Sequence, residues 1–93
     1  MSENINDTIF IGKKPLMTYF NSALFQLSAL PVIIIKARGS SIGPAVDVAQ
    51  IIMNKTNTFE LGKIKIDSES LESSDGKKRN VSTIEIPVKR IKS

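Results

Sequence analysis

The sequence predicts a small α+β fold with the order β-α-β-α-β-β, in which two helices pack on a four-stranded mixed sheet that extends into a long basic β-hairpin arm. Three observations support this fold: two apolar stripes at helical spacing, an unbroken β-branched run between them at residues 32–35, and two alternating segments near the end of the chain. The 93 residues are enough for one domain, and neither a linker nor a repeat divides them. We therefore expect a single domain over residues 1–93, with the polar residues 1–7 loose.

The first half of the chain reads as strand, helix and strand. Residues 8–11 form a short strand that ends at Gly12, and Pro15 is suited to the first position of a helix. Pro31 ends this helix, because the residue before a proline avoids helical geometry. Residues 32–36 form the next strand. The expected core stripe of the helix consists of Leu16, Phe20, Ala23, Leu24 and Leu27.

The second helix is expected from about Pro44 to Lys55, with Gly43 at its N-cap. Its apolar stripe is unusually wide, which is compatible with a subunit interface or with a broad core face. The residues after it, 54–62, are polar enough to be a loop. The stripe consists of Ala45, Val46, Val48, Ala49, Ile51, Ile52 and Met53.

The last third of the chain predicts a hairpin. Residues 63–69 and 82–89 alternate between apolar and polar side chains, as strands with one solvated face do, and Asp75-Gly76 marks the turn between them. The strands should continue beyond the body of the domain, because residues 68–74 offer few apolar side chains to bury. Pro87 cannot donate to a ladder and indicates an edge position or an unpaired register.

Several functional classes are excluded by composition. The chain has no cysteine and no histidine, so it lacks thiolate ligands and the commonest general base. Residues 39–43 lack the ending of a phosphate-binding P-loop, and the acidic residues of the hairpin lie among lysines. We expect no enzymatic activity, no metal and no cofactor. The apolar runs are too short for a bilayer and no signal peptide is evident, so a cytoplasmic protein without a membrane partner is expected.

The charge distribution favours a polyanionic partner. Thirteen basic residues against nine acidic ones give a net charge of +4, and the basic residues cluster at separate places, including Lys13-Lys14 and residues 77–79. The turn at residues 38–41 follows a buried strand and leads to a helix N-terminus, an arrangement that suits a phosphate. The same arrangement also occurs in α/β domains that bind no ligand.

Five segments of the sequence form a distinctive set. They are Ile11-Gly12-Lys13-Lys14-Pro15-Leu16-Met17, Ile34-Ile35-Lys36-Ala37-Arg38-Gly39, Ala45-Val46-Asp47, Ser74-Asp75-Gly76 and Val81-Ser82-Thr83-Ile84-Glu85-Ile86. In this order they resemble the Alba family, the small basic DNA- and RNA-binding proteins of archaeal chromatin. The resemblance implies a fold similar to the C-terminal domain of translation initiation factor three. It also implies a dimer with two hairpin arms that binds double-stranded DNA or RNA with little sequence preference, for chromosome packaging or RNA stabilisation.

The resemblance also implies the roles of individual residues. Lys13 and Lys14 match paired lysines that face the nucleic-acid backbone, one of which is an acetylation site in the family, and Tyr19 matches an aromatic residue near the same surface. Tyr19 can alternatively pack at the core edge, and Arg38 can cap the first helix or pair with Asp47. The expected nucleic-acid-binding residues are Lys13, Lys14, Tyr19, Lys36, Arg38, Ser40, Lys77, Lys78 and Arg79.

The sequence departs from the family pattern at Ser40, where many members have a second arginine, and at Gly43-Pro44, where they have Ser-Lys. Thr56 stands near a phenylalanine that joins dimers in the family, with Phe59 three residues later. Two alternatives therefore stay open: an accessory RNA-binding subunit of a ribonucleoprotein that resembles RNase P, and a heterodimer with a more basic paralogue. The sequence does not choose between DNA and RNA as the main target.

Overall fold

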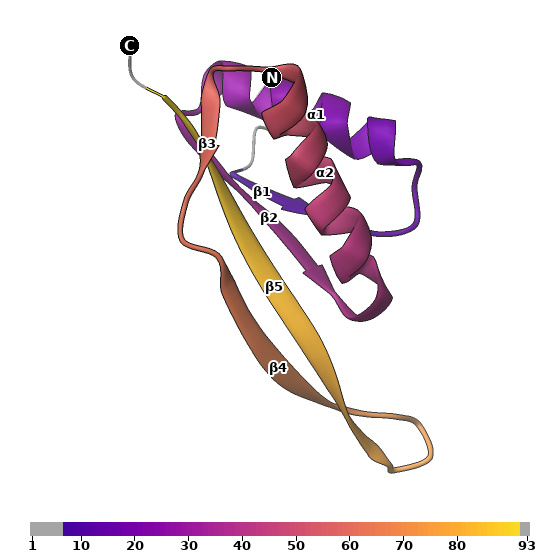
Figure 1. Ribbon diagram of the computed structural model, residues 1–93. Coiled ribbons are helices and arrows are strands. Elements are labelled where there is room, and N and C mark those ends of the chain that lie inside the picture. Colours follow the sequence, from indigo (N-terminus) through magenta and orange to yellow (C-terminus); the bar gives the residue numbers. More distant parts are fainter. Residues whose placement is uncertain (1–6, 92–93) are drawn as a thin grey trace, which may run out of the picture.

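The computed structural model describes residues 7–91, so most of the segment that was expected to be loose, and Lys92, lie outside the described residues. Figure 1 shows two helices on one side of a twisted sheet and a hairpin that projects from one end. The elements are β1 (Thr8–Phe10), α1 (Leu16–Ala29), β2 (Val32–Arg38), the 3₁₀ turn η1 (Gly39–Ser41), α2 (Ile42–Lys55), β3 (Phe59–Leu61), β4 (Lys65–Glu72) and β5 (Lys78–Arg90).

The sheet is mixed, and the predicted α+β fold is confirmed. β1 pairs with β2 in parallel, β2 pairs with β5 in antiparallel, and the far side of β5 is shared by β3 and β4. The sheet has five strands rather than four, because residues 59–61 form a strand in a segment that was expected to be a loop. Phe59 and Leu61 pack against the core from β3, an alternation too short to be recognised in the sequence.

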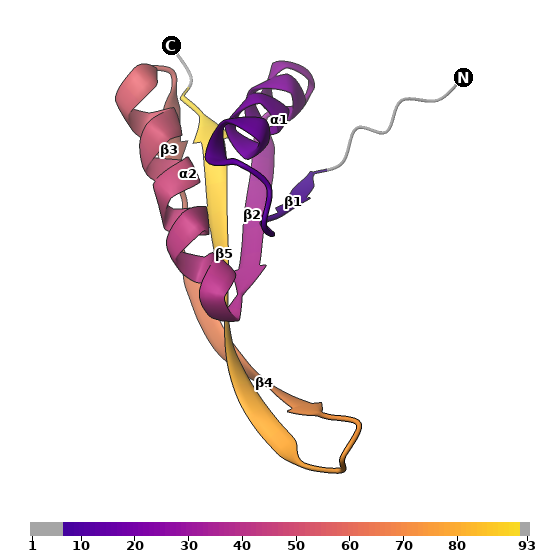
Figure 2. The ribbon, with the colours of Figure 1, turned by 90° about the vertical axis from the view of Figure 1, so that its right-hand side faces the viewer.

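The core lies between the helices and one face of the sheet. Ile33 and Ile35 of β2 and Ile86 and Val88 of β5 point to this face, because alternate strand residues share a face. The helices bury Phe20, Ala23 and Leu27 from α1 and Ala45, Val48, Ala49 and Ile52 from α2. Within the described chain no element covers the opposite face of the sheet, which we call the open face (Figure 2).

Helix α2 begins at Ile42, two residues before the predicted start, with the 3₁₀ turn directly before it. Pro44 is then the third helical residue, where its missing N–H is harmless because the first turn of a helix has no intrahelical acceptors for these groups. Gly39 has a φ of +58°, a backbone conformation that favours glycine, and this allows β2 to turn sharply into α2. The predicted apolar stripe of this helix does not lie wholly in the core, since its residue Val46 is 39% exposed.

Pro87 lies in β5, an inner strand, so the predicted edge position is wrong; it stands opposite Ile34 of β2, and only its other side lacks a strand partner. Its carbonyl accepts a hydrogen bond from the Gly62 N–H at 2.8 Å, so its ring nitrogen faces the same side of the strand. On that side β3 ends at Leu61 and β4 begins only at Lys65. The missing donor therefore falls at the break between the two strands that flank β5.

The hairpin of β4 and β5 forms a projecting arm. Lys65 to Glu72 pair in register with Glu85 to Lys78, and every residue of β4 is exposed. The tip turns at Gly76, which has a φ of +85°, and the Ser73 N–H donates to the Lys77 carbonyl across the turn. The arm bends away from the side on which α2 lies (Figure 2). It gives the molecule its length, with extents of 51 × 32 × 21 Å.

Candidate nucleic-acid interface

Three segments that carry basic residues meet at one end of the sheet. β1 and β2 are parallel, so the loop after β1 and the turn after β2 lie at the same edge, which is where parallel strands end. Arg38, at the end of β2, pairs with Thr83, and beyond this pair β5 continues alone with β4 into the arm. The Lys13-Lys14 loop, the turn at Arg38 to Ser41 and the arm thus share this end of the molecule (Figure 1).

The Lys13-Lys14 loop is held in shape by Tyr19 of α1. The Tyr19 hydroxyl accepts hydrogen bonds from the Gly12 N–H at 2.8 Å and the Lys14 N–H at 3.1 Å. A side chain at position 12 would crowd this hydroxyl, because an added Cβ would lie 3.1 Å from the oxygen. Both lysine side chains are exposed. The loop therefore presents two exposed cations, and its backbone is held by hydrogen bonds to the buried Tyr19 hydroxyl.

Tyr19 lies directly beneath this surface. Its side chain is only 8% exposed and belongs to the core, as the alternative of packing at the core edge describes. The backbone amides of Gly12 and Lys14 donate to its hydroxyl and are therefore not free for a phosphate. Tyr19 thus positions the loop that carries the lysines, and its ring offers no exposed face for stacking.

Arg38 extends over the open face of the sheet and pairs with the arm. Its Nη1 donates to Oε1 of Glu69 at 3.0 Å, and both side chains are at least half exposed. The capping of α1 that was considered for Arg38 is performed by Arg90, whose guanidinium donates to the carbonyls of Leu27 and Leu30. Because exposed ion pairs contribute about 0–1 kcal/mol, a phosphate can compete with Glu69 for Arg38.

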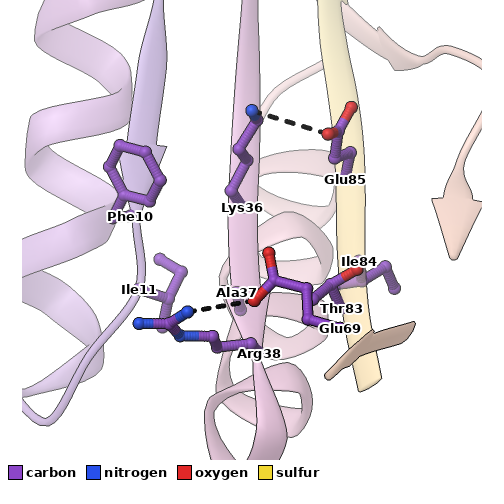
Figure 3. A pocket seen from close by; sticks show the side chains of 9 residues that line it. All are labelled: Phe10, Ile11, Lys36, Ala37, Arg38, Glu69, Thr83, Ile84 and Glu85. Atoms are coloured by element: carbon purple, nitrogen blue, oxygen red, sulfur yellow. Dashed lines mark hydrogen bonds and ion pairs between the residues drawn. The ribbon is translucent and has the colours of Figure 1, made fainter. Parts of the chain in front are cut away.

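Lys36 lies two residues earlier on the same face. Its Nζ is 3.5 Å from Oε2 of Glu85 on β5 and 6.0 Å from the centre of the Phe10 ring on β1. Phe10, Lys36 and Glu85 form a row across three strands, as the register requires (Figure 3). Ser40 is exposed in the 3₁₀ turn. Five of the predicted nucleic-acid-binding residues are thus accessible together at one end of the molecule, namely Lys13, Lys14, Lys36, Arg38 and Ser40.

The arm distributes its charges unequally between its two strands. Lys77, Lys78 and Arg79 are exposed at the start of β5, with Glu72 opposite Lys78 in the ladder. The acidic residues lie on β4 and in the turn, namely Asp67, Glu69, Glu72 and Asp75. Only one strand of the arm therefore presents a basic cluster.

The tip of the arm is shaped by Asp75. The Ser73 hydroxyl and the Lys77 N–H both donate to its carboxylate, and these bonds lower the pKa of Asp75 from its ordinary value of 3.8. The turn thereby places the basic cluster directly after a fixed loop.

Two residues beside the cations of the open face, Phe10 and Glu69, were not predicted from the sequence. Phe10 is 71% exposed on the open face, and the burial of its neighbours Ile9 and Ile11 is the alternation that indicates it. Glu69 had no such signal, because its contact with Arg38 joins positions 31 residues apart. A hollow of about 410 Å³ lies between Phe10, Lys36, Arg38 and Glu69 (Figure 3).

Residues 7–91 contain neither a cluster of metal-binding side chains nor a membrane-spanning helix. No group of three or more acidic side chains there is placed to hold a metal ion. No helix in this part of the chain is long and apolar enough to cross a membrane.

Comparisons with known proteins agree on one family. The Alba family model matches residues 7–68. The chain is 65% identical over 92 residues to the DNA/RNA-binding protein Alba of Nitrosopumilus maritimus, covering 97% of both chains, and 41% identical over 87 residues to that of Methanocella arvoryzae, covering 91% of both. Its structure is similar to that of Alba from Thermoplasma volcanium, with a TM-score of 0.82 and 42% identity over 89% of this chain and 99% of the other.

Proposed function

Since the chain belongs to the Alba family, we propose that it binds double-stranded DNA and RNA as a dimer, largely without sequence preference. The observation that carries the proposal is the meeting of the Lys13-Lys14 loop, the Arg38 turn and the arm at one end of the sheet. These groups offer cations to phosphates, and phosphate contacts carry no sequence information. Two relatives bear the name DNA/RNA-binding protein, which agrees with this chemistry.

The proposed contacts divide between the body and the arm. The body contacts the sugar-phosphate backbone of the nucleic acid through Lys13, Lys14, Lys36, Arg38 and Ser40. Arg38 can contact two phosphate oxygens once its ion pair with Glu69 is broken. Tyr19 supports this surface through the Lys13-Lys14 loop. The arm reaches along a groove with its basic cluster at the tip, Lys77, Lys78 and Arg79.

The dimer is supported by apolar side chains left exposed on the helix side of the sheet. Ile66 pairs with Ile84 in the ladder, so it points to the face that the helices cover, yet it is 79% exposed. Ile64, directly before β4, and Val46 on α2 are exposed as well. A second copy of the chain is the occupant we propose for these residues, because so small a chain buries only a modest part of its apolar surface alone.

Packaging of the chromosome in the cytoplasm, or stabilisation of RNA, is the cellular role that fits such binding. Acetylation of Lys13 or Lys14 would weaken binding, because it removes a positive charge from the loop. A Lys13→Gln/Lys14→Gln variant mimics the neutral state. If it bound as tightly as the wild type at the same salt concentration, the role of acetylation would be refuted.

The test of the proposed function is binding to duplex DNA and to structured RNA across a salt series. The wild type should bind both, with log affinity falling linearly as log salt rises, and Lys13→Ala/Lys14→Ala should bind more weakly with a slope reduced by about 2, one for each lost phosphate contact. The control Lys55→Ala/Lys89→Ala removes the same charge from the opposite end of the molecule, since Lys55 ends α2 and Lys89 pairs with Val32 at the start of β2.

Two outcomes would redirect the proposal. Equal slopes for the two double variants would mean that net charge, not this surface, drives binding. A strong preference for structured RNA over duplex DNA would favour the accessory subunit of an RNA-processing ribonucleoprotein. The heterodimer with a more basic paralogue stays a prediction, and mixing experiments followed by size determination would test it.

A further inference from the structure

We propose that the hollow on the open face binds an unpaired nucleobase, stacked on Phe10, so that the protein holds single-stranded as well as duplex nucleic acid. The proposal rests on the proposed function and adds a second mode of contact to it. Phosphate contacts at Lys13 and Lys14 require only a charged backbone, whereas this site requires a base that is free of its partner.

Phe10 is placed as a stacking platform. It is 71% exposed although it lies in a strand, because β1 is the edge of the sheet and no element of the described chain covers the open face. The ring stands at the base of the Lys13-Lys14 loop, three residues before Lys13. A base stacked on this ring would therefore belong to a strand whose phosphates can reach that loop. Stacking suits any base, because each has a π face.

The hollow beside the ring arises from the unequal lengths of two strands. β1 ends at Phe10, opposite Lys36, and the Ile11 N–H still donates to the Lys36 carbonyl at 2.9 Å, while β2 continues to Arg38 beyond its last pair with β1. The resulting space of about 410 Å³ lies within the range of small-ligand sites in proteins. Figure 3 shows Phe10 on one side of it and the Arg38–Glu69 ion pair on the other.

The polar groups around the hollow match a nucleotide. Lys36 and Arg38 supply donors for a phosphate or a base carbonyl, and the carboxylates of Glu69 and Glu85 can accept from an N–H group of a base, such as N3–H of uracil. The two ion pairs are exposed, so exchanging a carboxylate for a phosphate costs little.

A second copy of this chain is a poorer occupant. It would have to remove two cations and two carboxylates from water, which costs several kcal/mol per ion before any contact is made. The exposed apolar residues of the proposed dimer contact, Ile66 among them, lie on the other face of the sheet.

The test uses a single tryptophan, since the chain has none. In Phe10→Trp, an oligouridylate of about eight nucleotides should quench the indole emission in a saturable way, because the base stacks on the new ring. Phe25→Trp is the matched control, as Phe25 is exposed on α1, and its emission should not change.

Binding constants complete the experiment. Phe10→Ala should bind the oligouridylate at least about fivefold more weakly, and should bind an abasic oligomer of equal length and a DNA duplex as the wild type does. Phe10→Leu, which keeps the apolar volume without the aromatic ring, should behave like Phe10→Ala. Thermal unfolding of each variant verifies that the exposed substitution leaves the fold intact.

The outcomes separate this inference from the proposed function. Duplex binding that depends on Lys13 and Lys14, together with unquenched Phe10→Trp or with equal losses for the abasic oligomer, overturns the stacking site alone. Wild-type protein that binds neither the oligouridylate nor a duplex overturns both.

Discussion

Arg38 is a candidate to bind phosphate, and the carboxylate of Glu69, with which it is paired, competes for the same guanidinium. The guanidinium that is best suited to contact a phosphate on two oxygens already donates to Glu69 on the arm, at 3.0 Å. If Arg38 contacts a phosphate as we propose, the nucleic acid displaces this carboxylate, which then lies near the phosphate as a repulsive charge. We therefore expect Glu69 to weaken binding twice, by occupying Arg38 and by its own charge.

Glu69→Gln should strengthen the binding of duplex DNA by about fivefold at low salt, equivalent to about 1 kcal/mol. Protein stability should hardly change, because the pair is exposed. Fluorescence anisotropy with a labelled duplex measures the affinity, and thermal unfolding measures the stability. Glu60→Gln, which removes the same charge from β3 at the other end of β5, is the control. A gain of equal size in both variants would contradict a specific role for Glu69.

Tyr19 illustrates how a buried residue can serve an exposed site. Its hydroxyl joins the core to two amides of the Lys13-Lys14 loop, so the loop conformation depends on a side chain that the ligand does not touch. Each of these hydrogen bonds contributes about 0.5–1.5 kcal/mol. The family resemblance placed Tyr19 near the nucleic-acid-binding surface, and the structure shows its ring buried beneath the Lys13-Lys14 loop.

At the scale of elements, the arm is a two-stranded ribbon without a core of its own. Every residue of β4 is exposed, and a lone hairpin is only marginally stable in water. Its tip depends on polar contacts, above all on Asp75, which accepts from the Ser73 hydroxyl and the Lys77 N–H. The arm is therefore the element whose order is most sensitive to solution conditions.

The order of the arm tip should depend on pH in the acid range. The folded-state pKa of Asp75 is lowered from 3.8, so its contribution to stability is fully present above 3.8 and is lost as the pH falls through the folded-state value. Between pH 5 and pH 8 the tip should not change. NMR titration of the Asp75 carboxyl carbon and of the Lys77 amide measures this, with a peptide of residues 73–77 as the unfolded reference. A midpoint at or above that of the peptide would contradict the prediction.

At the scale of the whole molecule, function requires two copies as we propose it. One chain carries a modest charge of +4 and has one arm, whereas a dimer doubles both and offers two loops to one duplex. The contact that we propose between the copies consists of the apolar side chains that remain exposed on the helix side, Ile66 foremost.

Ile66→Glu should convert a dimer into a monomer, because it introduces a charge into the proposed apolar contact. Light scattering should give a mass near 10.2 kDa for the variant and twice that for the wild type. Duplex binding should weaken as well, since the two surfaces would no longer act together. Phe25→Glu, which alters an exposed apolar residue of α1, should remain dimeric. A monomeric wild type would leave the heterodimer as the form to be tested.

Local patterns in the sequence determined the order of the elements apart from β3, as well as the core faces, the turn of the arm and the sites of the basic clusters. Helical stripes, strand alternation and turn or cap residues such as Pro15 and Gly76 affect the backbone only within a few positions. Their structural effects can therefore be predicted from the sequence. The break in pairing at Pro87 was readable for the same reason.

Only the tertiary structure decided which charges meet and which faces stay open. Whether Arg38 is free or paired depends on the register of β4 and on the bend of the arm, which join residues 31 positions apart. The hollow beside Phe10 depends on where β1 ends relative to β2. Such contacts arise from the packing of elements distant in the chain, and no local pattern encodes the distances between them.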